Sequence, residues 1–170
     1  GVYLSSNDHI VAGSTIHDCS EAAVYIEGGT PEIEQVIAHN NSDGMYITGE
    51  AAVDVRDSTF RNNDDEGIYV YNSTLTLERS QVYQNGDDGI ESYIATGTKY
   101  LTLDNVTLAH NHGDGLYHRR GTSANLTTII RDTSVTHNGA YGVRDGSSVN
   151  YPLYWTCDQS NVWGNASAYT

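Results

Sequence analysis

Carboxylate side chains recur beside glycine along this chain, and carboxylates at regular spacing can transfer protons or bind a cation. Asp43, Glu66, Asp88 and Asp114 each stand directly before a glycine. If the segments that carry them stack, their charges lie roughly 4.8 Å apart and repel one another unless solvent or a cation neutralises them. We favour solvated turns in which these residues bond to the backbone. Calcium binding by the four carboxylates is the alternative.

The densest polar stretch is segment 110–120, with the sequence HNHGDGLYHRR. A glycoside hydrolase needs a pair of carboxylates, and a polysaccharide lyase needs a base such as His or Arg beside a cation that neutralises a uronate. If the protein is an enzyme, we expect its catalytic residues to be Asp87, Asp88, Asp114, His112 and Arg119. The rival interpretation is purely structural, because an aspartate before glycine already belongs to the repeat described below.

A row of tyrosines forms the third set, at two positions beyond a recurring glycine or its substitute. Its members are Tyr3, Tyr25, Tyr46, Tyr69 and Tyr117. Glu91 interrupts the row and Arg144 takes the same place near its end. Stacked exposed aromatics can stabilise a sheet through cross-strand contacts, bind a protein partner or support a sugar ring, and all three readings stay open.

A repeat of 21 to 27 residues positions all three sets. Its marker is an asparagine followed four residues later by glycine, with Cys19 and Ala23 in the first copy. The marker asparagines are Asn40, Asn63, Asn85, Asn111, Asn138 and Asn165. Spacing of this length is typical of a solenoid. We expect these asparagines to form an inward ladder in which each amide bonds to the asparagines of the coils above and below.

Each repeat also contains short segments in which apolar and polar residues alternate, such as Val53 with Val55 and Leu75 with Leu77. This period of two, with Val, Ile, Thr and Tyr, indicates strands rather than helices. Three short strands per repeat predict an all-β parallel β-helix of about seven coils, forming a single domain over residues 1–170 with an open coil at each end. An open coil exposes unpaired backbone, so the chain is expected either to continue into further coils or to stack end to end.

The repeat, which reads Gly-Ile-x-Val, Ser-x-Ile and then Asn, resembles the right-handed parallel β-helix family that includes pectate lyases. The resemblance covers nearly the whole chain and implies the fold. It implies no single function, because the family includes polysaccharide lyases, hydrolases and epimerases as well as fibres and adhesins. Gly86 to Gly89, with Asp87 and Asp88 between them, and the pair His112-Gly113 resemble polygalacturonase motifs, but the Arg-x-Lys element of those enzymes is missing.

The net charge of −14, with a single lysine, argues against nucleic acid as a partner, and no apolar run approaches the ~20 residues of a membrane span. We therefore expect an extracellular or cell-surface structural module, such as a fibre, adhesin or surface-layer segment, and not an enzyme. Its partner would be a further copy or further coils. The alternative is a lyase, hydrolase or epimerase fragment that acts on an acidic polysaccharide.

Cysteines and glycosylation motifs add smaller expectations. Cys19 and Cys157 lie six coils apart, too far for a disulfide within one chain, and we expect both thiols to be buried. A disulfide between stacked protomers is the alternative. Asn72, Asn105 and Asn125 are candidate N-glycosylation sites, whereas Asn40 and Asn165 should be inaccessible in the ladder.

Overall fold

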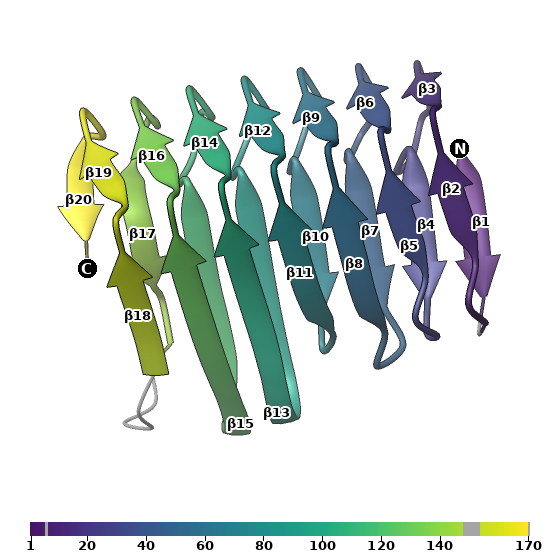
Figure 1. The fold of residues 1–170 in the computed structure, drawn as a ribbon. Helices are drawn as coiled ribbons and strands as arrows, with labels where there is room; N and C mark the ends of the chain where they lie inside the picture. The colour runs from purple at the N-terminus through teal and green to yellow at the C-terminus, as the bar shows by residue number, and fades with distance from the viewer. Residues whose placement is uncertain (6, 148–153, 170) are drawn as a thin grey trace.

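The computed structural model describes residues 1–5, 7–147 and 154–169, and these form a continuous stack of coils built from parallel strands (Figure 1). The strands lie in three rows along the stack. The first row contains β1 (Val2–Ser5), β4 (Val24–Glu27), β7 (Met45–Thr48), β10 (Ile68–Tyr71), β17 (Tyr141–Asp145) and β20 (Ser167–Tyr169). The second contains β2 (Ile10–Ala12), β5 (Glu32–Glu34), β8 (Ala52–Arg56), β11 (Thr74–Glu78) and β18 (Tyr154–Asp158). The third contains β3 (Thr15–His17), β6 (Ile37–His39), β9 (Thr59–Arg61), β12 (Gln81–Tyr83), β14 (Thr107–Ala109), β16 (Ser134–Thr136) and β19 (Asn161–Trp163).

Two long strands, β13 (Ile90–Asp104) and β15 (Leu116–Arg131), belong to the first and second rows at once. Every strand pair is parallel, as in a β-helix, and each strand inside a row pairs with its equivalents one coil before and one coil after. The all-β parallel β-helix predicted from the repeat is thus confirmed. The described part of the chain contains no helix, and therefore none that could cross a membrane.

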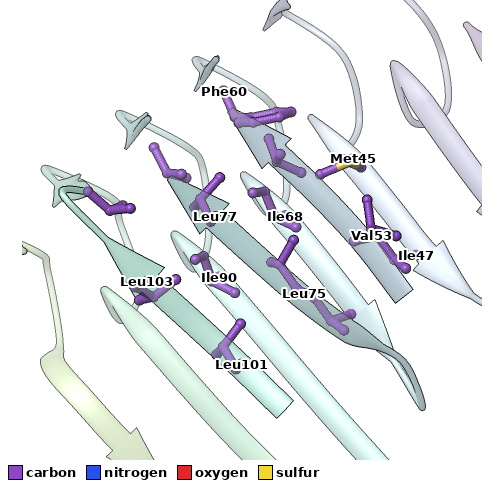
Figure 2. Packing of buried hydrophobic residues seen from close by; sticks show 14 of the residues in the cluster. Met45, Ile47, Val53, Phe60, Ile68, Leu75, Leu77, Ile90, Leu101 and Leu103 are labelled. Carbon is purple, nitrogen blue, oxygen red and sulfur yellow. The ribbon is translucent and has the colours of Figure 1, made fainter. Parts of the chain in front are cut away.

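Alternate residues of each strand point into the stack and form one core along its length (Figure 2). Ile68, for example, lies beside Met45 of the previous coil and Ile90 of the next. Leu75 likewise lies between Val53 and Leu101. Full burial of one such side chain contributes about 1.5–3 kcal/mol, so these continuous rows supply the main stabilisation of the coils.

The asparagine ladder is present and fully buried in the middle of the stack. Asn63 Nδ2 donates to Asn85 Oδ1 at 3.0 Å, and Asn85 Nδ2 donates to Asn111 Oδ1 at 2.9 Å. The ladder continues through Asn138 to Asn165 with bonds of 3.0 and 2.9 Å. Each Oδ1 also accepts the backbone N–H of the asparagine one coil earlier, for example Asn63 N at 3.1 Å from Asn85 Oδ1.

The predicted position of the second rung was wrong by one residue. Asn41, not Asn40, is the rung, and its Nδ2 donates to Asn63 Oδ1 at 3.1 Å. Gly44 comes three places after Asn41 instead of four, so counting back four places from the glycine reached Asn40. Asn40 is exposed, which also overturns the expectation that its glycosylation motif is inaccessible.

Asn40 has a different role, shared by the residue before the rung in every coil. It adopts the left-handed backbone conformation at φ 56°, as do Asn62 at φ 53° and His110 at φ 57°. The left-handed corner and the ladder therefore belong to two consecutive residues: one turns the chain, and the next points inward to bond to the neighbouring coil.

A second, shorter ladder of hydroxyl groups lies at another corner. The backbone N–H of Ser58 donates to Ser80 Oγ at 3.0 Å, and that of Thr133 donates to Ser160 Oγ at 3.1 Å. The residue before each again has positive φ, as at Asp57 and Arg79. The small polar residue of the repeat therefore satisfies a buried backbone donor, as such groups require.

In the later repeats the sequence between the glycine and the next asparagine is longer, which predicts insertions at 94–99, 118–123 and 145–148 that stack on one side. The first two are parts of β13 and β15. Thr96 pairs with Ser123 and Thr98 with Asn125, so the two do stack. Figure 1 shows both strands extending beyond the ends of their neighbours. The third expected excursion, at 145–148, lies partly outside the described residues.

The widened coils enclose a polar cluster. Ser92 Oγ lies 2.7 Å from His118 Nδ1, and Thr128 Oγ1 lies 3.2 Å from His118 Nε2. Arg120, whose side chain is 1% exposed, pairs with Asp145 at 2.7 Å. Apolar residues alone do not fill this part of the core, and every nitrogen of the His118 ring has a hydroxyl partner.

The cysteines are free, and only part of the burial prediction was right. Cys157 aligns with Ile130 on the inward row as expected, but it is exposed. Its strand, β18, pairs only with β15, so no further coil in the described residues covers it. Cys19 stands at the ladder position, where its backbone N–H donates to Asn41 Oδ1 at 3.1 Å, and it is half-buried.

Candidate functional site

The tyrosine row lies on the outer face of the first row of strands. Tyr3, Tyr25, Tyr46 and Tyr69 come from β1, β4, β7 and β10, each between two inward-pointing residues of its strand. Parallel pairing without a register shift places them side by side. Successive ring centroids are 5.5, 5.0 and 4.9 Å apart.

The rings stack on one another, which limits what they can offer to a ligand. The planes of Tyr25 and Tyr46 differ by 3°, so the face of each ring covers the other. Such contacts stabilise the sheet, one of the three readings that the sequence left open. They leave ring edges and hydroxyl groups toward solvent, so an inner tyrosine of the row cannot support a sugar on its face.

A groove runs beside the first tyrosines. Its narrower part has a volume of about 280 Å³ and is lined by Tyr25, Tyr46, Glu21 and Asp43, with Ser20, Ala22 and Ser42. It shares Ser20, Glu21, Ala22 and Tyr25 with a wider hollow of about 740 Å³ that reaches Tyr3 and Glu27. One wall therefore consists of tyrosine edges and the other of the turn that carries the carboxylates.

The carboxylates before glycine align along the turn as predicted. The N–H of Gly44 donates to Glu66 O and that of Gly67 donates to Asp88 O, which places Asp43, Glu66 and Asp88 on successive coils. Burial, together with a hydrogen bond to Asp43, raises the pKa of Glu66 to about 8. Burial likewise raises the pKa of Asp88 to about 7. Both groups can hold a proton near neutral pH.

Asp114, the fourth member, is buried in a different environment. Its Oδ1 accepts the Tyr141 N–H at 2.7 Å, and its Oδ2 pairs with Arg144 Nε at 2.6 Å. The Arg144 guanidinium lies 3.8 Å from the centre of the Tyr117 ring. Asp88 accepts the backbone N–H of Asp114 at 2.5 Å, which links the two acids.

Glu91 of β13 and Arg119 of β15 form an ion pair beyond the last stacked tyrosine of the row. Arg119 Nη1 donates to Glu91 Oε1 at 2.8 Å, and its guanidinium lies 5.1 Å from the Tyr93 ring centre. Tyr69, one coil before Glu91, has its pKa raised to about 12 by burial and by the Glu91 charge. Its hydroxyl group therefore stays protonated and can donate a hydrogen bond.

A family model described as the right handed beta helix region matches residues 1–150 of this chain. The chain belongs to the right-handed β-helix family. The right-handed winding that the sequence resemblance implied therefore agrees with this family. No curated protein matches the sequence significantly.

Two solved structures resemble this β-helix. The A-module of mannuronan C-5 epimerase AlgE4 from Azotobacter vinelandii has a TM-score of 0.71 at 11% identity, over 99% of this chain and 57% of that module. The A-module of AlgE6 from the same organism has a TM-score of 0.49 at 13% identity, over 100% of this chain and 53% of the module. At 11% identity the first likeness shows a shared fold, and the second is too distant to add to it. The chain spans little more than half the length of either module.

The β-helix gathers only some of the residues predicted for catalysis. Asp88 and Asp114 are buried, and the Asp88 carboxylate accepts the backbone N–H of Asp114. Asp87 and His112 are exposed. Arg119 pairs with Glu91 and not with either aspartate. Glu91 and Arg144 were noted in the sequence as interruptions of the tyrosine row, but neither was predicted as a site residue. The sequence feature that could have identified them is a charged residue at a position that is tyrosine in the other coils.

Calcium binding by Asp43, Glu66, Asp88 and Asp114 has no support in the geometry. Within residues 1–5, 7–147 and 154–169, no group of three or more His, Cys, Asp or Glu side chains could hold a metal ion. The repulsion expected between stacked carboxylates is relieved in other ways: Glu66 bonds to Asp43, Asp88 accepts a backbone N–H, and Asp114 pairs with Arg144.

The three glycosylation candidates differ in exposure. Asn105 and Asn125 are exposed, the first at a left-handed corner and the second on β15. The Asn72 amide is half-buried and donates to Glu50 at 2.5 Å, while its Oδ1 accepts the Thr96 N–H at 3.2 Å. Glycosylation stays a prediction at all three, and Asn72 is the least accessible.

Proposed function

We propose that this β-helix binds a polysaccharide chain along its axis, over the tyrosine row and the groove beside it. The observation that carries this proposal is the groove itself, which crosses adjoining coils between the edges of Tyr25 and Tyr46 and the side chains of Glu21 and Asp43. A ligand that repeats along its length suits a surface that repeats along its length, because each unit then meets equivalent partners.

The chemistry of the surface supports a sugar ligand. Tyrosine hydroxyl groups both donate and accept hydrogen bonds, and carboxylates accept them, which matches the hydroxyl groups of a glycan. The 4.9–5.5 Å between successive rings is close to the length of one hexose in an extended chain. The fold shared with the mannuronan C-5 epimerase A-module adds support from a protein whose name describes action on a polysaccharide.

We place this function outside the cell, where long polysaccharides occur. The sequence favoured a structural module that stacks end to end. That assembly stays a prediction, whereas the groove and the shared fold favour the polysaccharide alternative.

Replacing Tyr46 with alanine is expected to weaken polysaccharide binding about tenfold, the equivalent of 1.4 kcal/mol, because the groove loses part of one wall. Tyr83→Ala is the matched control. Tyr83 is also half-buried, but it lies on β12, in the third row of strands, away from the groove. Affinity electrophoresis through gels that contain neutral, acidic or amine-bearing glycans gives the measurement. Equal losses in both variants, or no retardation of the unmodified protein in any gel, would reject the proposed function.

A second candidate function, modification of the bound polysaccharide, is favoured by one observation. Asp88 has its pKa raised to about 7 and Glu66 to about 8, and a carboxyl group that holds its proton near neutral pH can act as a general acid. Asp88 is bonded to the coil of Asp114, and it belongs to the set that the sequence predicted for catalysis.

If this second function is correct, Asp88→Asn should reduce product formation by about 100-fold or more, because a general acid contributes 10²–10⁴-fold. Asparagine keeps the oxygen that accepts the Asp114 N–H, so the fold should be retained. Ultraviolet absorbance detects unsaturated lyase products, reducing-end assays detect hydrolysis, and NMR detects epimerised sugars. Asp132→Asn, at an exposed corner before β16 in the third row of strands, is the control. Equal turnover by the Asp88→Asn variant and the unmodified protein would exclude Asp88 as the acid.

A further inference from the structure

The walls of the groove carry negative charge. Glu21 and Asp43 line its narrower part, and Asp18 and Glu27 line the wider hollow. Of the described residues that line the two, none is lysine or arginine. A concave surface lined by charges of one sign concentrates the opposite charge, and the net charge of −14 acts in the same direction.

Both arginines on the neighbouring part of this face are engaged with carboxylates. Arg119 donates to Glu91 at 2.8 Å, and Arg144 Nε lies 2.6 Å from Asp114 Oδ2. Each also lies against a tyrosine ring, Tyr93 or Tyr117. An anionic sugar placed on this face would meet guanidinium groups whose charge a protein carboxylate already balances.

We propose that the groove selects a polysaccharide whose sugars carry protonated amines, such as β-1,4-linked glucosamine. This inference rests on the proposed function and specifies its ligand class. A protonated sugar amine has three N–H donors and no acceptor, and the groove presents acceptors: the Glu21 and Asp43 carboxylates and the hydroxyl oxygens of Tyr25 and Tyr46. A uronate chain would bring its own carboxylates against Glu21 and Asp43.

Isothermal titration calorimetry with four hexamers tests this selection on the 170-residue chain, at a pH at which sugar amines are protonated. The probes are hexamers of glucosamine, N-acetylglucosamine, mannuronate and lysine. The glucosamine hexamer is expected to bind about tenfold more tightly than the N-acetylglucosamine hexamer, because acetylation removes the charge that the carboxylates recognise. The mannuronate hexamer should bind most weakly.

Two substitutions that change the net charge equally separate the groove from the overall charge. Glu21→Gln removes a carboxylate from the groove and should weaken glucosamine binding about fivefold. Glu34→Gln removes an exposed carboxylate from β5, in the second row of strands, and should change the affinity by less than about twofold. Similar losses in both variants would overturn the proposal, because the affinity would then follow net charge alone.

The probes also separate failure of this inference from failure of the proposed function. Tighter binding of the N-acetylglucosamine or mannuronate hexamer would overturn the amine preference and leave polysaccharide binding intact. Equal binding of the lysine hexamer would overturn it as well, since the groove would then recognise charge without the sugar. Binding of none of the three sugars would reject the proposed function itself.

Discussion

Replacing Asn85 with alanine is expected to lower the free energy of unfolding by about 5–7 kcal/mol. Asn85 Oδ1 accepts the backbone N–H of Asn63 at 3.1 Å and its side-chain amide at 3.0 Å, while Asn85 Nδ2 donates to Asn111 Oδ1 at 2.9 Å and Phe60 O at 3.3 Å. Alanine removes all four bonds and leaves a buried backbone donor unsatisfied. A typical hydrogen bond contributes about 1 kcal/mol, and an orphaned buried group costs about 1–3 kcal/mol more.

Urea unfolding followed by circular dichroism measures this loss, and Asn125→Ala provides the matched control. Asn125 is exposed on β15, so its replacement should change stability by less than about 0.5 kcal/mol. If the two variants unfold at the same urea concentration, the ladder does not stabilise the coils as argued here. A changed slope with an unchanged midpoint would instead point to the unfolded state.

The ladder also shows how far the sequence could predict the fold. Rungs from Asn63 to Asn138 were placed correctly because the interval from asparagine to glycine is constant there, and the rung at Asn165 because it follows Asn138 at the preceding interval of 27 residues. The rung at Asn41 was missed for two reasons. The turn before Gly44 is one residue shorter than in the other coils, and both adjacent candidates, Asn40 and Asn41, are asparagines. Only contact with Asn63 decides between the two.

The candidate site was less predictable than the fold, because its chemistry depends on pairs formed between coils. The tyrosine and carboxylate rows follow from the repeat. The repeat does not reveal that Asp114 pairs with Arg144 from the next coil, or that Glu66 bonds to Asp43 from the previous one. Such pairs depend on side-chain geometry, and they decide which carboxylates hold a proton and which arginines are already paired.

Lowering the pH from about 6.5 to about 4 is expected to cost up to about 3 kcal/mol of stability through His118 alone. Burial lowers the pKa of this imidazole to about 4 in the folded protein. The nearby Arg120 charge also lowers it, and the Asp145 charge opposes the shift. In the unfolded chain it titrates near 6.5. Between these values the unfolded state binds a proton that the folded state does not, so stability falls as the pH falls.

Glu66 and Asp88 change stability with pH in the direction opposite to His118. Their folded-state pKa values are raised to about 8 and about 7, so their contribution is present at low pH and is lost as the pH rises through those values. The whole-protein profile therefore combines opposing effects. The contribution of His118 to the pH dependence of stability is therefore obtained by comparing the unmodified protein with a His118 variant at the same pH.

Substituting His118 with asparagine supplies that difference, because the asparagine amide can still bond to Ser92 but does not titrate. The stability of the unmodified protein minus that of His118→Asn should fall by up to about 3 kcal/mol between pH 7 and pH 4, and denaturant unfolding at each pH gives the curve. His112→Asn, at an exposed position two residues from Asp114, should give a much flatter difference. A flat difference for His118→Asn would mean that the imidazole becomes charged inside the folded core. The Ser92 and Thr128 hydroxyl groups would then have to stabilise an imidazolium beside Arg120, contrary to the desolvation argument.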